Sequence, residues 1–247
     1  PRSSSAASDV YKRQSQIHVI GAGTMGGDIA AVAAMSGFEV TLQDISADAV
    51  DRAIERARTL YERRLKAPQK VEAAMARLRA DAGGEGLASA DLLIEAVAED
   101  LAIKKAVFAD AESKMKPGAI MATNTSAIPL EDIGAALNDP ARLIGMHFFN
   151  PVPVLPLVEV VYTDASDGSF VDRAMYVCGA LKKLPVRCKS APGFLVNRAL
   201  LPYVFKAVEA MLNGADPDRI DQALVGFGMP MGPVSYTHLR AHETKRN

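Results

Sequence analysis

Three glycines between an apolar strand and an alanine-rich helix constrain the fold of this chain more than any other feature. The strand is predicted at residues 17–20 and the helix at 25–35. The run between them, Gly21-Ala22-Gly23-Thr24-Met25-Gly26, fits the pattern G-x-G-x-x-G. The first glycine permits a tight turn, the second lets the backbone approach a ligand, and the third allows the helix to pack closely on the strand. The pattern therefore predicts a βαβ unit.

The same glycine run predicts a dinucleotide site. The helix that begins within it directs free N–H groups and a partial positive charge at bound phosphates. Asp44 ends the next predicted strand 23 residues after Gly21, where a carboxylate binds adenosine ribose hydroxyls and repels a 2′-phosphate. We therefore expect NAD rather than NADP, with a glycine-rich turn that holds no ligand as the alternative. The predicted contacts are Gly21, Gly23, Thr24, Met25, Gly26 and Asp44.

Strand-like and helix-like segments alternate along most of the chain. Further strands are predicted at residues 40–42, 92–94, 120–123, 143–147, 157–161 and 184–187. Helices are predicted from Ser46 to 65, onward to about 79, and at 101–115, after 129 and at 171–181. Such alternation predicts an α/β fold, a doubly wound, Rossmann-like parallel sheet covered on both faces. From residue 193 onward the pattern is helical only, at 195–212 and 217–227.

The two ends of the chain carry an inverted DNA repeat. Residues 9–14 are what the string GATGTGTATAAGAGACAG encodes, and residues 234–239 are what its reverse complement encodes in another frame. Because this resembles a tag used in shotgun sequencing, we expect residues 1–14 and 234–247 to be scars outside the fold. Natural polar tails are the alternative. The predicted domains are then the nucleotide-binding domain at 15–190 and the start of an all-helical second domain, truncated, at 191–233.

Composition excludes several classes of protein. Hydrophobic residues make up 49% of the chain and charged residues 23%, with a formal net charge of −1, so we expect no nucleic-acid partner. No apolar run approaches the ~20 residues that cross a bilayer. The two cysteines, Cys178 and Cys188, lack both metal-ligand spacing and the density of a disulfide scaffold. We therefore expect a reducing compartment, and no metal site.

A histidine and a glutamate stand on consecutive predicted strands. His147 precedes the Pro-bounded turn at 148–151, and Glu159 follows twelve positions later within the apolar run 157–161. Apolar neighbours predict a buried carboxylate, which needs a partner. A carboxylate on one imidazole nitrogen orients the ring while the other nitrogen accepts a proton. We therefore predict His147 as a general base, with a structural histidine as the alternative.

Two further polar residues are candidates for contact with a reacting oxygen. Ser126 follows the strand at 120–123, at the sheet edge where open α/β folds bind ligands. An ordinary helix-start serine is the alternative. Asn197 lies in the first turns of the second domain, and its amide can donate to a developing oxygen charge. Asparagine is otherwise unfavourable inside a helix.

These residues, together with Gly145-Met146-His147-Phe148-Phe149-Asn150-Pro151, resemble the 3-hydroxyacyl-CoA dehydrogenase family over residues 17–233. The resemblance implies that an (S)-3-hydroxyacyl-CoA is oxidised to the 3-oxoacyl-CoA with NAD, in fatty-acid β-oxidation. His147 would be the base oriented by Glu159, with Ser126 and Asn197 holding the reacting oxygens. Gly-Thr-Met-Gly-Gly-Asp-Ile-Ala at 23–30 and the helix around 60–75 look more like the dehydrogenase part of a multifunctional fatty-acid oxidation protein.

The resemblance also implies a wider set of contacts. Glu99, Lys104 and Asn150 would lie near the nicotinamide, although from the residues alone they are solvated charges and a turn asparagine. It implies an acyl-CoA substrate, and a homodimer or a β-oxidation complex in the bacterial cytoplasm, or the mitochondrial matrix of a eukaryote. CoA would meet basic residues that are otherwise the solvated face of a helix, namely Arg56, Arg58, Arg63, Arg64, Lys66 and Lys70.

Two other functions are weighed against this one. A β-hydroxyacid dehydrogenase acting on free acids would rely on a lysine base, and no lysine stands beside Asn197. A non-catalytic NAD-binding relative, comparable to some crystallins, would have no need of the four candidate residues of the reaction centre. Because the helical domain stops at Pro233, we expect these 247 residues to be weakly active or inactive. Its uncovered helix faces should favour aggregation.

Overall fold

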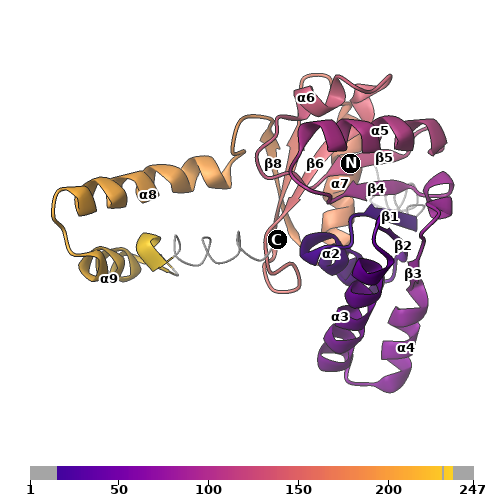
Figure 1. The fold of residues 1–247 in the computed structure, drawn as a ribbon, viewed down its shortest axis with the longest axis horizontal. Helices are drawn as coiled ribbons and strands as arrows, with labels where there is room; N and C mark the ends of the chain where they lie inside the picture. The colour runs from indigo at the N-terminus through magenta and orange to yellow at the C-terminus, as the bar shows by residue number, and fades with distance from the viewer. Residues whose placement is uncertain (1–15, 230, 236–247) are drawn as a thin grey trace, which may run out of the picture. The chain divides into compact units, whose positions relative to one another are not determined.

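A computed structural model describes residues 16–229 and 231–235 of the chain. It forms two compact units, Pro1–Phe194 and Leu195–Asn247, and each is described by itself (Figure 1). Phe194 belongs to the first unit, four residues beyond the boundary predicted at 190. No helix within the described residues is long and apolar enough to cross a membrane.

The first unit is built on a sheet that has eight strands within the described residues, in the order β3-β2-β1-β4-β5-β6-β7-β8 (Figure 1). From β3 to β6 every neighbouring pair is parallel, and the order reverses between β1 and β4. The predicted Rossmann-like architecture is confirmed. The strands are β1 (Gln16–Ile20), β2 (Glu39–Gln43), β3 (Leu78–Ala80), β4 (Leu92–Glu95), β5 (Ile120–Thr123), β6 (Leu143–Phe148), β7 (Leu157–Tyr162) and β8 (Leu184–Lys189).

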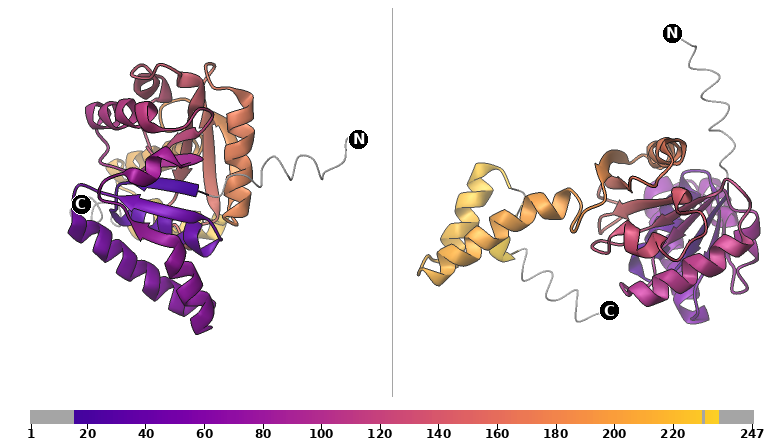
Figure 2. Two further views of the ribbon diagram at one scale, coloured as in Figure 1. Left: turned by 90° about the vertical axis from the view of Figure 1, so that its right-hand side faces the viewer. Right: turned by 90° about the horizontal axis from the view of Figure 1, so that it is seen from above.

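Helices cover both faces of this sheet (Figure 2). Successive side chains of a strand point to opposite faces. Leu92 and Ile94 accordingly pack in the core with α2, α3 and α7, whereas Leu93 packs in the core with α5 and α6. As predicted, Ser46 caps α3, with its hydroxyl accepting from the Ala49 N–H at 3.3 Å. The helices are α2 (Thr24–Met35), α3 (Ala47–Leu65), α4 (Pro68–Arg77), α5 (Leu101–Lys114), α6 (Leu130–Gly134) and α7 (Gly168–Ala180), with 3-10 turns at η1 (Glu85–Ala88) and η2 (Pro140–Arg142).

The prediction of a wholly parallel sheet is wrong at one pairing. β6 and β7 are antiparallel, and β8 runs parallel to β7. The reason is the length of the connection, because only residues 149–156 separate β6 from β7. A parallel pair needs a crossover of a dozen or more residues, whereas an antiparallel pair accepts a short one.

The predicted extension of a helix to about residue 79 is also wrong. α4 ends at Arg77, and Leu78–Ala80 form β3, which pairs with β2 at the edge of the sheet. Leu78 is buried and aligns with Val40. Pairing with a strand remote in sequence outweighs local helical preference here.

The second unit contains α8 (Val196–Leu212) and α9 (Pro217–Phe227), and residues 233–235 are also helical. After α9, the backbone N–H groups of Val234 and Ser235 donate to the Asp221 carboxylate, each at 2.9 Å. The expectation that residues 234–247 stay outside the fold is wrong for these two, since this carboxylate satisfies their N–H groups. Residues 1–15 and 236–247 lie outside the described residues.

Candidate active site

The glycine run forms the turn between β1 and α2, and two of its glycines are required by crowding. Gly21 has a φ of 103°, and an added Cβ would lie 2.5 Å from the Ala96 carbonyl oxygen. A Cβ on Gly26 would lie 1.8 Å from the Gly21 oxygen. A Cβ on Gly23 would meet no atom of the described chain within 4 Å. The turn therefore leaves open space at Gly23, beside the N-terminus of α2 that begins with Thr24 and Met25, which fits a bound phosphate.

Asp44 stands beside this turn, at the end of β2. Its carboxylate accepts from the Ala22 N–H at 2.6 Å and from the Ser46 N–H at 2.9 Å. Arg56 of α3 donates to the Gly23 carbonyl oxygen at 3.2 Å. Residues from β2 and α3 thus hold the glycine turn from two sides. The predicted dinucleotide contacts are together at one end of the sheet.

His147 and Glu159 form a cross-strand pair between β6 and β7. They are register partners, and the distance from Nδ1 of His147 to Oε2 of Glu159 is 2.6 Å. Glu159 is fully buried and His147 is 7% exposed. The rings of Phe149 and Phe194 flank the imidazole at 4.5 and 5.8 Å between centroids. Among the described residues, none hydrogen-bonds Nε2 of His147, so that nitrogen can accept a proton from a ligand.

The antiparallel pairing explains this geometry. Directly opposed residues of an antiparallel pair place their side chains on the same face, within contact distance. Each strand then supplies one member, and the apolar neighbours in Leu157–Tyr162 bury the glutamate. The predicted burial of Glu159 is confirmed.

Asn124, which the sequence reasoning missed, ties the Ser126 segment to the histidine strand. Its side-chain oxygen accepts from the Phe148 N–H at 2.9 Å, immediately after His147. Ser126 follows two residues later and is partly exposed. Polar residues directly after the buried strand β5 were the available signal. The structure therefore joins the carboxyl ends of β5 and β6 through one amide.

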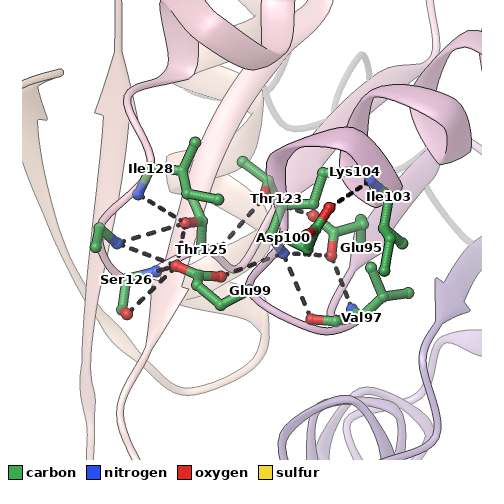
Figure 3. A network of polar contacts seen from close by, with 11 residues as sticks. Glu95, Val97, Glu99, Asp100, Ile103, Lys104, Thr123, Thr125, Ser126 and Ile128 are labelled. Carbon is green, nitrogen blue, oxygen red and sulfur yellow. Dashed lines mark hydrogen bonds and ion pairs between the residues drawn. The ribbon is translucent and has the colours of Figure 1, made fainter.

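Glu99 organises the segment that carries Ser126 (Figure 3). Its Oε1 accepts from the Thr125 hydroxyl and from the backbone N–H groups of Ser126 at 2.9 Å and Ala127 at 3.3 Å. Burial opposes ionisation, but the Thr125 hydrogen bond and the Lys104 charge outweigh it and lower the pKa of Glu99. Its carboxylate is therefore ionised at neutral pH.

Lys104 is a buried cation, so its interpretation as a solvated charge is wrong. The side chain is 1% exposed, and Nζ lies 2.7 Å from Oε1 of Glu95 and 3.4 Å from Oε2 of Glu99. Glu95 itself is fully buried at the end of β4. The sequence reasoning missed Glu95, although a carboxylate directly after the apolar run at 92–94 was the available signal. A buried charge needs a partner, and Lys104 supplies it.

The loop that follows the histidine strand is held by two cations. Lys183, buried between α7 and β8, donates to the carbonyl oxygens of Val152 and Leu155. Arg64 of α3 donates to the Pro153 oxygen at 3.2 Å. Burial and the nearby charge of Arg64 lower the pKa of Lys183. Sequence reasoning missed Lys183. Asn150, a predicted cofactor contact, is exposed at the start of this loop.

A cavity of about 210 Å³ lies between this loop and the first helices. Burial raises the pKa of the Asp28 carboxyl in its wall, and the charge of Arg56 opposes that shift. Of the basic candidates on α3, Arg56 and Arg63 line the cavity. Arg58 does not, and it forms an ion pair with Glu72 at 2.8 Å. The walls of the cavity are formed by Asp28, Ala31, Arg56, Ala57, Thr59, Leu60, Arg63, Pro151, Pro153 and Val154.

Asn197 belongs to the second unit. It is the second residue of α8 and is partly exposed. Within the described part of the chain, no cluster of three or more metal-ligating side chains occurs.

Comparison with protein families identifies both units. Residues 16–191 match the model for the NAD binding domain of 3-hydroxyacyl-CoA dehydrogenase, and residues 193–247 match the model for its C-terminal domain. The crystal structure of 3-hydroxybutyryl-CoA dehydrogenase from Escherichia coli superposes with a TM-score of 0.89 at 41% identity, covering 92% of this chain and 49% of that one.

Individual relatives agree in sequence as well. The chain is 43% identical over 229 residues to 3-hydroxyadipyl-CoA dehydrogenase of Escherichia coli, covering 90% of this chain and 48% of the relative. It is 39% identical over 224 residues to the fatty acid oxidation complex subunit alpha of Acinetobacter baylyi, covering 89% and 31%. The chain thus spans about half the length of the Escherichia coli relative and less of the Acinetobacter one.

Proposed function

The chain belongs to the 3-hydroxyacyl-CoA dehydrogenase family, and we propose that the protein oxidises an (S)-3-hydroxyacyl-CoA to the 3-oxoacyl-CoA with NAD. One observation carries the proposal. His147 and Glu159 form a buried pair at 2.6 Å, at the end of β6 where the sheet binds ligands. This arrangement suits a general base whose orientation is fixed by a carboxylate.

The cofactor fits across the point where the strand order reverses. The pyrophosphate would meet the N-terminus of α2, and the adenosine ribose would meet Asp44 on the β2 side. The nicotinamide half then extends over the carboxyl ends of β4 and β5, toward Glu99, Lys104 and Ser126. When bound there, NAD supplies the acceptor for the hydride that leaves C3 of the substrate.

His147 would take the proton of the substrate hydroxyl on Nε2 as the hydride departs. Glu159, on Nδ1, stabilises the imidazolium that forms and keeps the ring in place. Ser126 and Asn197 would donate hydrogen bonds to the reacting oxygen and the thioester carbonyl. The oxidation then balances, because C3 loses a hydride to NAD and its hydroxyl loses a proton to His147.

For CoA, we propose contact at the cavity beside the loop at 151–154. Arg56 and Arg63 line it, and an arginine fork matches phosphate oxygens in geometry and charge. The apolar loop residues of the cavity would meet the uncharged part of the ligand. Of the six basic candidates, these two are therefore preferred. We propose that Asn150, at the start of the loop, contacts the nicotinamide side of the cofactor.

The names of the relatives support a proposal for the setting in the cell. The Acinetobacter protein is named as a subunit of a fatty acid oxidation complex. We propose that the whole protein acts in β-oxidation in the cytoplasm of a bacterium, as a homodimer or within such a complex. The predicted scar at residues 1–14 and the weak activity of these 247 residues stay predictions.

The experiment is a turnover assay with acetoacetyl-CoA and NADH on a full-length version, followed by the loss of NADH absorbance. Turnover of the thioester, abolished in His147→Gln, supports the proposal. Turnover of free 3-oxoacids alone would instead indicate a β-hydroxyacid dehydrogenase; a 3-hydroxyisobutyrate dehydrogenase of Mycobacterium tuberculosis shares the fold at 16% identity. NADH binding without turnover of either would indicate a non-catalytic relative.

A further inference from the structure

Glu95 and Lys104 form a buried ion pair, and Glu95 has no role in the reaction steps proposed above. Glu95 is fully buried, Lys104 is 1% exposed, and their N–O distance is 2.7 Å. Removing two charges from water is costly, and the attraction between them does not always offset that cost. The position of the pair is specific. Glu95 aligns with Ile20 and Thr123 at the carboxyl ends of β1, β4 and β5, on both sides of the point where the strand order reverses.

Lys104 has two carboxylate neighbours, and it is held closer to one. Its ammonium is 2.7 Å from Glu95 but 3.4 Å from Glu99, and it also lies 3.5 Å from the Val97 carbonyl oxygen. Two further donors hold the carboxylate of Glu95, the Val97 N–H and the Thr123 hydroxyl, each at 2.7 Å. The buried residue is therefore the stronger and better fixed partner of the ammonium (Figure 3).

The two oxygens of Glu99 consequently differ. Oε1 accepts the donors of the segment at 125–127. Within the described part of the chain, Oε2 has only the more distant ammonium, and the side chain is 41% exposed. A carboxylate oxygen in this state retains capacity to accept a hydroxyl donor from a ligand.

Thr123 provides a second link between Glu95 and the same segment. Its hydroxyl donates to Glu95 and accepts from the Thr125 N–H at 3.2 Å. Glu95 thus acts on residues 124–127 from one side through Thr123 and from the other through Lys104 and Glu99. That segment also carries Asn124, which holds the strand of His147.

We propose that Glu95 is a positioning residue for the nicotinamide half of the cofactor, because it draws the Lys104 ammonium away from Glu99 and fixes the Ser126 segment. The inference rests on the NAD binding of the proposed function. Without the charge on Glu95, the ammonium would move onto Glu99 and occupy the oxygen that faces the ligand. The adenosine half, bound at Asp44, would be unaffected.

The test compares two probes on the 247-residue chain, NADH and ADP, since ADP lacks the nicotinamide half. In Glu95→Gln we expect the Kd for NADH to rise by about tenfold, as when a buried charge pair loses one member. The Kd for ADP should stay within about twofold, because its contacts are distant from the change. NADH is titrated by its fluorescence, and ADP by its displacement of NADH.

The matched control is Glu112→Gln. Glu112 is a carboxylate of α5, the helix that carries Lys104, and it holds a loop by accepting from the Asn138 and Asp139 N–H groups at 2.8 and 2.7 Å. Neither Kd should change beyond about twofold there. If Glu95→Gln does not fold, Thr123→Val serves instead, and it should weaken the binding of NADH but not that of ADP.

Two results would overturn the inference. One is an unchanged Kd for NADH in Glu95→Gln. The other is an equal loss of affinity for ADP and NADH, which would indicate a general loosening of the domain. Failure of the proposed function would look different. It would appear as NADH binding by the unaltered full-length protein without turnover of acetoacetyl-CoA.

Discussion

The sheet buries two histidines, one in β1 and one in β6, and their partners differ. His18 uses both ring nitrogens, with Nδ1 at 2.7 Å from the Thr41 hydroxyl and Nε2 at 3.0 Å from the Gln43 side-chain oxygen. Among the described residues, His147 has a hydrogen-bond partner at Nδ1 alone, a carboxylate at 2.6 Å, and it lies near the carboxyl end of β6. Burial is common to both histidines and does not by itself mark the proposed base. The number and charge of the partners differ between the two.

The electrostatics follow the same division. Burial lowers the pKa of His18, opposed by the hydrogen bond to the Gln43 side-chain oxygen and by the charge of Asp81 at 3.7 Å. His18 is therefore neutral at pH 7 and held by dipoles. His147 instead has a carboxylate in direct contact with Nδ1, at 2.6 Å. We expect the β1–β2 side of the sheet to bind ligand and the β6–β7 side to do chemistry.

Replacing His147 should have the largest effect. In a full-length protein, His147→Gln should lower kcat by about 10² to 10⁴-fold, the usual cost of losing a general base. NADH affinity should stay near normal, because the adenosine half and pyrophosphate bind elsewhere. The measurements are steady-state turnover of acetoacetyl-CoA and fluorescence titration of NADH.

His18→Gln is the matched control for that experiment. It removes the other buried histidine of the sheet and should leave kcat within a few-fold of normal, since His18 touches no reacting atom. Normal turnover in the His147 variant would place the base elsewhere. Equal losses in both variants would remove the distinction between the two sites.

Glu159→Gln should have the next largest effect on turnover. The amide keeps the shape of the side chain but loses the charge that stabilises an imidazolium, so oxidation should slow by roughly tenfold or more. The measurement is steady-state turnover of acetoacetyl-CoA by the full-length variant. An unchanged kcat would assign Glu159 a purely structural role.

The preference for NAD over NADP tests the role proposed for Asp44, on the β1–β2 side of the sheet. In Asp44→Ala the ratio of NADP to NAD dissociation constants should fall by about tenfold, because a like charge no longer faces the 2′-phosphate. The chemical step with bound NAD should change little. Equal affinity for the two cofactors in the unaltered protein at low salt would contradict the role of Asp44.

Much of this arrangement could be predicted because short segments of the sequence determine it. The glycine turn, the Ser46 cap and the buried Glu159 each depend on neighbours within a few residues. The antiparallel pairing of β6 and β7 was also within reach, since eight residues cannot form a parallel crossover. It was missed because the alternation of strands and helices was applied to the whole sheet.

The remaining contacts could not be predicted from local pattern. Glu95, Thr123 and Lys104 come from β4, β5 and α5, and only the strand order makes them neighbours. Asn124 finds its partner 24 residues away on β6, and Lys183 holds carbonyl groups of a loop about 30 residues earlier. A charged side chain near a helix start is usually solvated, so nothing in the local sequence indicated that Lys104 is buried in the folded protein.

The smallest expected effect concerns the pH dependence of stability and belongs to His18. Its folded pKa lies below the ordinary value of 6.5, so above that value the ring is neutral in both states and its contribution is complete. As pH falls below 6.5, the unfolded chain binds a proton that the folded protein refuses, and stability is lost. The Tm of thermal unfolding should therefore fall between pH 7 and pH 5, by about 2–4 °C for each kcal/mol of stability lost. His18→Gln should flatten that slope. The carboxylates Glu99 and Glu112, whose pKa values are lowered, lose their contribution only below about 4.5. A slope unchanged in His18→Gln would show that the histidine of β1 is not the group that titrates.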